Sequence, residues 1–121
     1  MTGLVVVDGA NVVGSRPDGW WRDRPGAARR LAERLAAGVP LPGELVLVLE
    51  GAARRGVPEG DESGVRVVHA AGSGDDAIVD LVAAASGRPV TVVTSDRGLR
   101  ARVAALGAAT VGPRALDSDH P

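Results

Sequence analysis

Unbroken runs of aliphatic residues are the strongest pattern in this chain. Leu and Val dominate three of them, at residues 3–7, 44–49 and 89–94. A strand that is buried on both faces has this pattern, because neither face needs polar side chains. Two shorter and more polar runs, at residues 65–69 and 109–111, predict two further strands at the edges of the same sheet.

Three segments between these strands carry apolar residues at helical spacing. Pro25 suits the first turn of a helix, and Gly38 follows the end of the first segment. Residues 9–23 and 52–64 are expected to be connecting loops. The alternation of strands and helices predicts an α/β fold with a mostly parallel sheet and helices on both faces. The expected helices span residues 25–37, 75–85 and 99–106.

The composition fits a small protein of the cytoplasm. The chain has 121 residues, enough for one core, and we expect a single domain over residues 1–121. The absence of Cys excludes disulfides, thiolate zinc sites and a Cys nucleophile, and it suits a reducing compartment. No apolar run approaches the roughly 18 residues of a membrane helix, and no basic segment precedes an apolar one at the N-terminus. We therefore expect a cytoplasmic protein without a membrane partner.

The positive charges of the chain are all Arg. The formal net charge of −1 by itself neither favours nor excludes a nucleic acid as partner. All 14 cationic residues are Arg, whose planar guanidinium makes the bidentate contacts that suit phosphate groups. A GC-rich genome would also favour Arg over Lys, so this bias alone does not identify a function.

Acidic residues recur where the predicted sheet ends. Three of them directly follow the three central strands, and three more lie in the first turns of the helix at 75–85. Because the carboxyl ends of parallel strands share one edge, we expect all six carboxylates on one rim. Carboxylates held a few ångströms apart either raise each other's pKa or need a bound cation to balance their charge. Mg²⁺ and Mn²⁺ are the cations that oxygen ligands of this kind usually bind. The six residues are Asp8, Glu50, Asp75, Asp76, Asp80 and Asp96.

Each of these acids also has a structural explanation. The segment from Ser73 to Asp76 fits a capping box, and Ser95 with Asp96 fits an N-cap followed by the first helical residue. Capping does not require acids after three separate strands, however, so their conjunction favours a shared site. Asn11 lies three residues beyond Asp8, and its amide can turn back toward that carboxylate to orient a metal ligand or a metal-bound water.

Three motifs, in this order, resemble one known family. They are D-G-A-N after the first strand, G-x-G-D-D-A-I-V-D at a helix start, and T-S-D-R after a later strand. Together they resemble the NYN branch of the PIN-like nucleases, and within it the YacP-type proteins. The resemblance implies an α/β/α sandwich with five strands in the order 3-2-1-4-5. It also implies a metal-dependent ribonuclease whose acids hold one or two Mg²⁺ or Mn²⁺ ions.

The resemblance also assigns roles to individual residues. Asp8 corresponds to the first-strand metal ligand and Asn11 to its amide partner, and Asp96 to the acid after the fourth strand. The family's metal ligand on the middle helix corresponds to one of two adjacent residues, Asp75 or Asp76. Asp75 suits the family's D-x-x-I pattern, whereas Asp76 suits its pattern of two acids on one helical face, and we favour Asp76. The remaining acids are Asp80, the partner of Asp76 on that face, and Glu50, which stands where some members carry an additional acid.

The predicted reaction is hydrolysis of RNA phosphodiester bonds, in which a metal polarises the phosphoryl oxygen and activates a water. The substrate is expected to be single-stranded RNA. Arg side chains, with Ser95 beside them, would contact its phosphates. Two Trp residues would stack on its bases, or would instead belong to the hydrophobic core and cover the edge of the sheet. A second copy of the chain would complete the groove, and a ribosome or another partner would deliver the RNA. These substrate-binding candidates are Trp20, Trp21, Arg22, Arg54, Arg55, Ser95, Arg97 and Arg100.

Three other functions are compatible with acids at strand ends. One is an RNA-binding module of the same fold with weak or no activity. Another is a nucleotide phosphohydrolase that uses the same acids. The third, a phosphoacceptor switch of the receiver type, needs a Lys near the acceptor Asp, and this chain has none. The sequence contains no G-x-x-x-x-G-K-[ST] loop and no dinucleotide-binding glycine motif.

Overall fold

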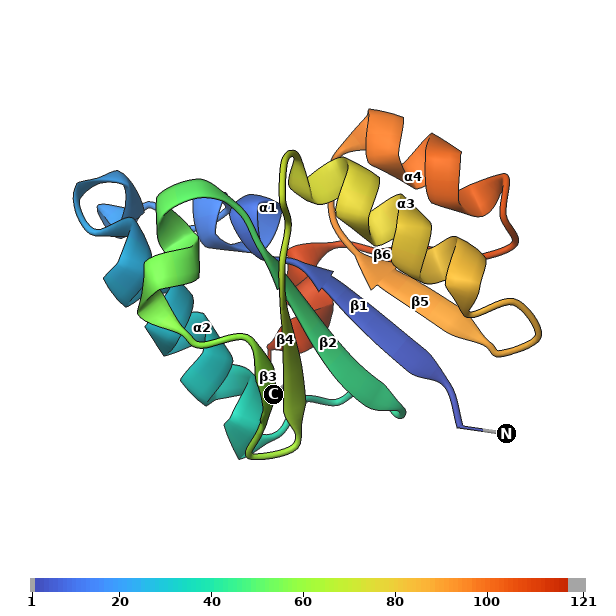
Figure 1. The fold of residues 1–121 in the computed structure, drawn as a ribbon, viewed down its shortest axis with the longest axis horizontal. Helices are drawn as coiled ribbons and strands as arrows, with labels where there is room; N and C mark the ends of the chain where they lie inside the picture. The colour runs from blue at the N-terminus through green and yellow to red at the C-terminus, as the bar shows by residue number, and fades with distance from the viewer. Residues whose placement is uncertain (1, 118–121) are drawn as a thin grey trace.

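A six-stranded sheet forms the centre of the molecule, as the computed structural model of residues 2–117 shows (Figure 1). The order of the strands is β3-β4-β2-β1-β5-β6, and every neighbouring pair is parallel except β3 with β4. This confirms the predicted α/β class with a mostly parallel sheet. The strands are β1 (Leu4–Asp8), β2 (Glu44–Leu49), β3 (Gly60–Glu62), β4 (Val65–His69), β5 (Val90–Val93) and β6 (Ala109–Val111).

β1 is one of the two central strands and is buried along its whole length. It pairs with β2 on one side and with β5 on the other. Val6 packs into the core on one face of the sheet, whereas Val5 and Val7 pack into the core on the opposite face. Both faces of the strand are therefore dry, which explains why the sequence of β1 is uniformly aliphatic.

Helices cover both faces of the sheet, so the fold has three layers (Figure 1). Ile78 of α3 and Leu99 of α4 belong to the core on one face, and Val12 of α1 and Leu31 of α2 belong to the core on the other. The α-helices are α1 (Gly9–Gly14), α2 (Arg24–Ala37), α3 (Gly74–Ala84) and α4 (Arg97–Ala104), and three 3-10 turns are η1 (Trp20–Arg22), η2 (Gly51–Gly56) and η3 (Pro113–Leu116).

The prediction of a connecting loop over residues 9–23 was wrong, because this segment contains α1 and η1. α1 has only six residues, too few for a helical period to appear in the sequence. Asp8 caps this helix by accepting a hydrogen bond from the Asn11 backbone N–H. The polar turn at the end of β1 is thus the beginning of a helix, and this placement fixes both Asp8 and Asn11.

The prediction of five strands missed β3, within the supposed loop 52–64. All three of its residues are exposed, so it has no apolar pattern. It forms an antiparallel hairpin with β4 through Ser63 and Gly64, which both have positive φ, at 52° and 83°. β4 is therefore not an edge strand, whereas β6 is. The five predicted strands nevertheless lie in the expected relative order, 3-2-1-4-5.

Gly9 allows α1 to begin directly against β2. A Cβ atom at this position would lie 2.5 Å from the Val48 carbonyl oxygen and 2.9 Å from Cδ2 of Leu49. We expect Gly9→Ala to lower the free energy of unfolding by about 1–3 kcal/mol, the usual effect of overpacking a core. Gly72→Ala is the matched control, because nothing lies within 4 Å of its added Cβ. Chemical denaturation measures both, and equal stability of the two variants would contradict this expectation.

Candidate active site

Asp8 is the buried acid at the centre of the candidate site. Only 4% of the residue is exposed, at the carboxyl end of β1. Its Oδ2 accepts a hydrogen bond from the Thr94 hydroxyl at 2.9 Å, and its Oδ1 accepts one from the Asn11 backbone N–H at 3.3 Å. Burial raises the pKa of Asp8 above its ordinary value, the two hydrogen bonds oppose this shift, and the charges of Asp75 and Glu50 add to it.

The Asn11 side chain joins α1 to the segment after β5. Its Oδ1 accepts hydrogen bonds from the Ser95 backbone N–H at 2.8 Å and from the Ser95 hydroxyl at 3.0 Å. The expectation that this amide turns back toward Asp8 was wrong, because the backbone N–H of Asn11 makes that contact instead. Asn11 and Ser95 nevertheless lie together, as expected for two groups that position the same ligand.

Thr94 connects Asp8 to Asp96. Its side chain is fully buried, and its hydroxyl oxygen accepts a hydrogen bond from the Asp96 N–H at 3.1 Å while donating to Asp8. Asp96 is the N-cap of α4 and accepts a hydrogen bond from the Leu99 N–H at 2.9 Å, so the expected Ser95 cap was wrong. We had not singled out Thr94, although its place in T-S-D beside Asp96 was the available signal.

Asp75 is the acid of α3 that belongs to this rim. Burial raises its pKa, and the charges of Asp96, Glu50 and Asp76 raise it further, while Arg102 lowers it. Glu50 anchors the start of α3, because its Oε1 accepts a hydrogen bond from the Gly74 N–H at 2.9 Å. Asp75 thus interacts electrostatically with acids that follow two different strands.

Asp76 and Asp80 lie outside this cluster. The Asp76 side chain is 71% exposed and forms an ion pair with Arg102 of α4 at 3.1 Å, and Asp80 is exposed as well. Asp75 precedes Ile78 by three residues and so shares the helix face that packs on the sheet, because Ile78 is fully buried. The structure therefore favours Asp75 over the Asp76 that we expected.

The four clustered acids, Asp8, Glu50, Asp75 and Asp96, offer the hard oxygen ligands that Mg²⁺ and Mn²⁺ prefer. In residues 2–117, no three or more His, Asp or Glu side chains are close enough together to hold an ion as they stand. Asp8 and Asp96 instead direct oxygens at backbone N–H groups of α1 and α4. The chemistry of the donors thus fits a divalent cation, and binding requires these carboxylates to turn toward one another.

Asp8 makes the stability of the metal-free protein depend on pH. Its pKa in the folded chain lies above the ordinary 3.8. Stability therefore falls as the pH rises from about 4 through this raised pKa, because the folded chain binds the proton more tightly than the unfolded chain. We expect Asp8→Asn to be more stable than the natural chain at about pH 7, and this difference to shrink near pH 4. Thermal unfolding in EDTA measures it, and a less stable variant at the higher pH would contradict the expectation.

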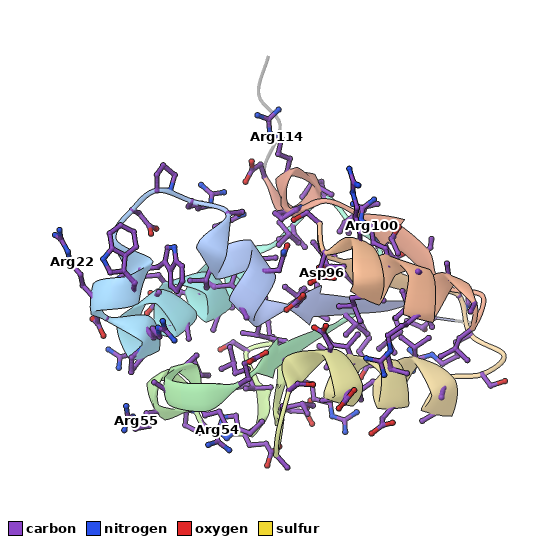
Figure 2. The ribbon with its side chains drawn as sticks, turned by 90° about the horizontal axis from the view of Figure 1, so that it is seen from above. Arg22, Arg54, Arg55, Asp96, Arg100 and Arg114 are labelled. Carbon is purple, nitrogen blue, oxygen red and sulfur yellow. The ribbon has the colours of Figure 1, made fainter. Side chains whose placement is uncertain are left out.

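Several arginines lie around Asp96 when the molecule is seen from above (Figure 2). Arg54 and Arg55 of η2 and Arg22 of η1 lie on one side of Asp96 in this view, and Arg100 lies on the other. Two of these arginines are held in place by the backbone. Arg54 donates to the carbonyl groups of Gly51 and Ala70, and Arg100 donates to that of Thr94 at 2.8 Å. Arg97 is exposed at the start of α4.

Trp20 and Trp21 form an edge-to-face pair with ring centroids 5.9 Å apart. The Arg24 guanidinium lies 5.3 Å from the Trp20 ring centroid, and that of Arg22 lies 5.7 Å from the Trp21 ring centroid. Trp21 is 54% exposed, and neither residue is part of the two hydrophobic cores of the described chain. The Trp21 ring is therefore placed on the surface, as stacking on a base requires, whereas Trp20 is half-buried.

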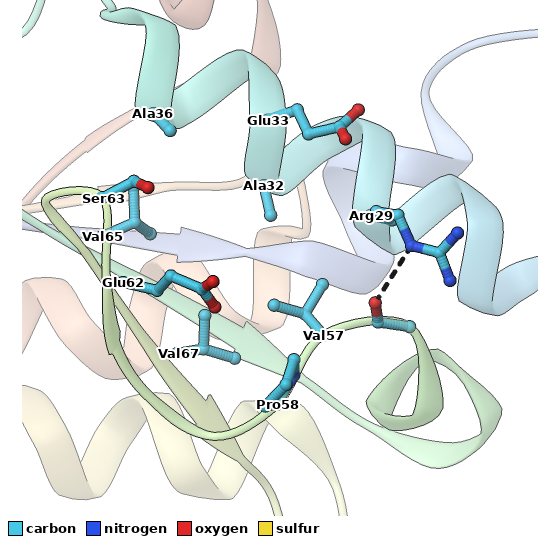
Figure 3. Close-up of a pocket in the computed structure, with 11 residues that line it drawn as sticks. Arg29, Ala32, Glu33, Ala36, Val57, Pro58, Glu62, Ser63, Val65 and Val67 are labelled. Carbon is cyan, nitrogen blue, oxygen red and sulfur yellow. Dashed lines mark hydrogen bonds between the residues drawn. The ribbon is translucent and has the colours of Figure 1, made fainter.

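A separate pocket of about 300 Å³ lies between α2 and the β3–β4 hairpin (Figure 3). Arg29 closes one end by donating a hydrogen bond to the Gly56 carbonyl at 3.4 Å. Val57, Val65 and Val67 line its interior. None of the clustered acids contributes to it, so we do not include this pocket in the candidate active site.

Comparison with known proteins shows the fold of this chain. No protein-family model matches it, and no curated protein does either. Among solved structures, a mutant of Rae1 (YacP) from Bacillus subtilis matches with a TM-score of 0.71 and 20% sequence identity, over 94% of this chain and 72% of that chain. This similarity confirms the fold expected from the resemblance to YacP-type proteins. None of the described helices has the length and apolar character to cross a membrane.

Proposed function

We propose that this protein is a metal-dependent ribonuclease whose active site is the rim formed by Asp8, Asp75 and Asp96. The observation that carries the proposal is the pair of hydrogen bonds by which Thr94 joins Asp8, at the end of β1, to Asp96, which follows β5. Asp75, in the first turn of α3, lies near enough for its charge to raise the pKa of Asp8. Ligands of open α/β sheets bind at this edge. The sequence motifs resemble the YacP-type branch of the PIN-like nucleases, and the chain shares its fold with Rae1 (YacP). The agreement of motifs and fold supports a nuclease.

The three acids would hold one or two Mg²⁺ or Mn²⁺ ions. When bound, the metal supplies a Lewis acid for the phosphoryl oxygen and lowers the pKa of a bound water. Thr94 holds the Asp8 carboxylate in place through a hydrogen bond of 2.9 Å. Ser95, with the Asn11 amide against it, would position the scissile phosphate or a water. Asp76 and Asp80 have no place in this proposal, because both are exposed and Asp76 forms an ion pair with Arg102.

The substrate is proposed to be single-stranded RNA. Its phosphates would meet exposed Arg97 beside Asp96, and Arg54 and Arg55 of η2. The exposed Trp21 ring offers a stacking surface, and a single strand presents unpaired bases to such a ring. A second copy of the chain, or a ribosome or another RNA-delivering partner, would extend this surface.

Incubation of labelled single-stranded RNA with the purified protein in Mn²⁺, Mg²⁺ or EDTA tests the proposal. We expect cleavage in the presence of metal and none in EDTA, and no turnover of nucleoside triphosphates in parallel reactions. Triphosphate hydrolysis without RNA cleavage would identify a nucleotide phosphohydrolase instead.

An RNA-binding protein without nuclease activity is the second candidate function. The observation that favours it is that no three acids in residues 2–117 are arranged to hold an ion. This candidate predicts RNA binding that is unchanged by Mn²⁺, Mg²⁺ or EDTA, with intact RNA recovered in every case. The same incubation therefore separates the two candidates.

A further inference from the structure

A small pocket adjoins the acidic rim and shares Glu50 with it. Its volume is about 200 Å³, and it lies between the start of α1 and the turn that follows β2. Gly9 and Ala10, the residues after Asp8, form one side of it, and Glu50 and Gly51 form another. A group bound here would therefore lie next to the segment that begins with Asp8, one of the carboxylates to which we assign RNA cleavage.

The walls of this pocket suit a flat ring. Trp20, Leu49 and Val13 supply apolar surface. Pockets for drug-sized ligands usually exceed about 300 Å³, so the volume suits a smaller group, such as one nucleobase. The contacts of Trp20 with Trp21 and Arg24 hold its ring in place, which reduces the entropy lost when a base binds.

The polar groups of the pocket form a donor and an acceptor pair. Arg24 contributes a guanidinium, whose fork of N–H groups makes no hydrogen bond within the described chain. Glu50 contributes a carboxylate with one oxygen, Oε1, bonded to the Gly74 N–H. Its second oxygen has no hydrogen-bond partner among residues 2–117, and Oε1 keeps a second lone pair, so the carboxylate can accept two hydrogen bonds from a ligand.

Guanine complements this pair better than the other bases. It presents two adjacent donors, N1–H and the N2 amino group, and on another edge two acceptors, O6 and N7, which suit a guanidinium. Adenine and cytosine place an acceptor beside their amino group, and uracil has one N–H between two carbonyls. Against a carboxylate, each of these bases would set an acceptor against an acceptor or leave a donor unused.

We propose that the pocket formed by Trp20, Arg24, Leu49 and Glu50 binds an unpaired guanine of the RNA strand, beside the phosphate at the acidic rim. This inference rests on the proposed RNA substrate, and it gives that substrate a preferred base. Glu50 accepts from the N1–H and N2 edge, and Arg24 donates to O6 and N7.

Binding measured in EDTA tests the pocket independently of cleavage. The probes are short oligouridylates with a single central guanine, inosine, 7-deazaguanine or adenine, added to the full chain and followed by Trp fluorescence. We expect guanine to bind about tenfold more tightly than inosine, which lacks the N2 amino group, and than adenine. 7-Deazaguanine, which lacks the N7 acceptor, is expected to bind more weakly than guanine. Equal binding of all four probes to the natural chain would overturn the proposal.

Glu50→Gln tests the role of the carboxylate. The Gln side chain keeps an oxygen for the Gly74 N–H and replaces the free carboxylate oxygen by an amino group. We expect the preference for guanine over inosine to fall to within about twofold. Glu33→Gln, an exposed acid of α2, is the matched control and is expected to keep the preference. A guanine preference that survives in folded Glu50→Gln protein would overturn the assignment.

The outcomes also separate this inference from the proposed ribonuclease activity. Guanine-selective binding without cleavage in any metal would contradict the nuclease and leave the pocket standing. Metal-dependent cleavage of RNA by a protein that binds all four probes equally would leave the nuclease standing and contradict the pocket.

Discussion

Asp8→Asn is expected to reduce metal-dependent RNA cleavage at least about 100-fold, because the variant loses several kcal/mol of charge stabilisation at the metal. The Asn side chain has nearly the same shape and keeps an oxygen for the Asn11 N–H. The Thr94 hydroxyl can turn to accept from the Asn amide while it still receives the Asp96 N–H. The loss of cleavage is therefore expected in a folded protein.

Thermal unfolding provides the control for this variant. Millimolar Mn²⁺ is expected to raise the melting temperature of the natural chain, because a ligand that binds only the folded state stabilises it. It is expected to have little effect on Asp8→Asn. A variant that cleaves RNA at the natural rate, or that is stabilised by Mn²⁺ as much as the natural chain, would contradict the role of Asp8.

The second large effect distinguishes two neighbouring acids. Asp75→Asn is expected to reduce cleavage by about 100-fold or more, whereas Asp76→Asn is expected to stay within about threefold of the natural rate. The two side chains differ in their surroundings. Asp75 shares the helix face of buried Ile78, and its charge raises the pKa of Asp8, whereas the exposed Asp76 side chain pairs with Arg102. The ion pair of Asp76 is solvent-exposed and adds little stability, so its removal is a suitable control.

Steady-state cleavage of one labelled RNA by both variants makes this comparison. Circular dichroism and melting temperature confirm that each variant is folded. The reverse result, with Asp76→Asn inactive and Asp75→Asn active, would return the metal ligand to the outer face of α3 and contradict the rim described above.

The strands were predictable because they are buried. β1 and β2 are aliphatic on both faces, so burial leaves a direct mark on their sequence. β3 has no such apolar pattern, because all three of its residues are exposed and the strand is held by backbone pairing with β4. α1 was not predicted for a related reason, since this helix of six residues buries only Gly9 and Val12. The elements that were missed are those held by caps and backbone hydrogen bonds.

The candidate site was predictable in outline and not in detail. Asp8 and Asp96 follow parallel strands, and the carboxyl ends of such strands share one edge. The choice between Asp75 and Asp76 depended on which face of α3 packs on the sheet. The burial of Ile78 favours Asp75, and the D-x-x-I spacing already placed Asp75 and Ile78 on one face. Thr94 was missed because the T-S-D motif places it beside Asp96 but does not show that its hydroxyl also donates to Asp8, 86 residues away in the sequence.

The position of a bound Mn²⁺ ion tests the proposed function most directly. Crystals of the natural chain grown with Mn²⁺ and measured near the manganese absorption edge locate the ion by its anomalous scattering. We predict a peak that is coordinated by carboxylate oxygens of Asp8 and by at least one of Asp75 and Asp96, at about 2.0–2.2 Å as for other small divalent cations. A peak elsewhere on the protein, or none at saturating Mn²⁺, would contradict a metal-dependent ribonuclease with its site at this rim.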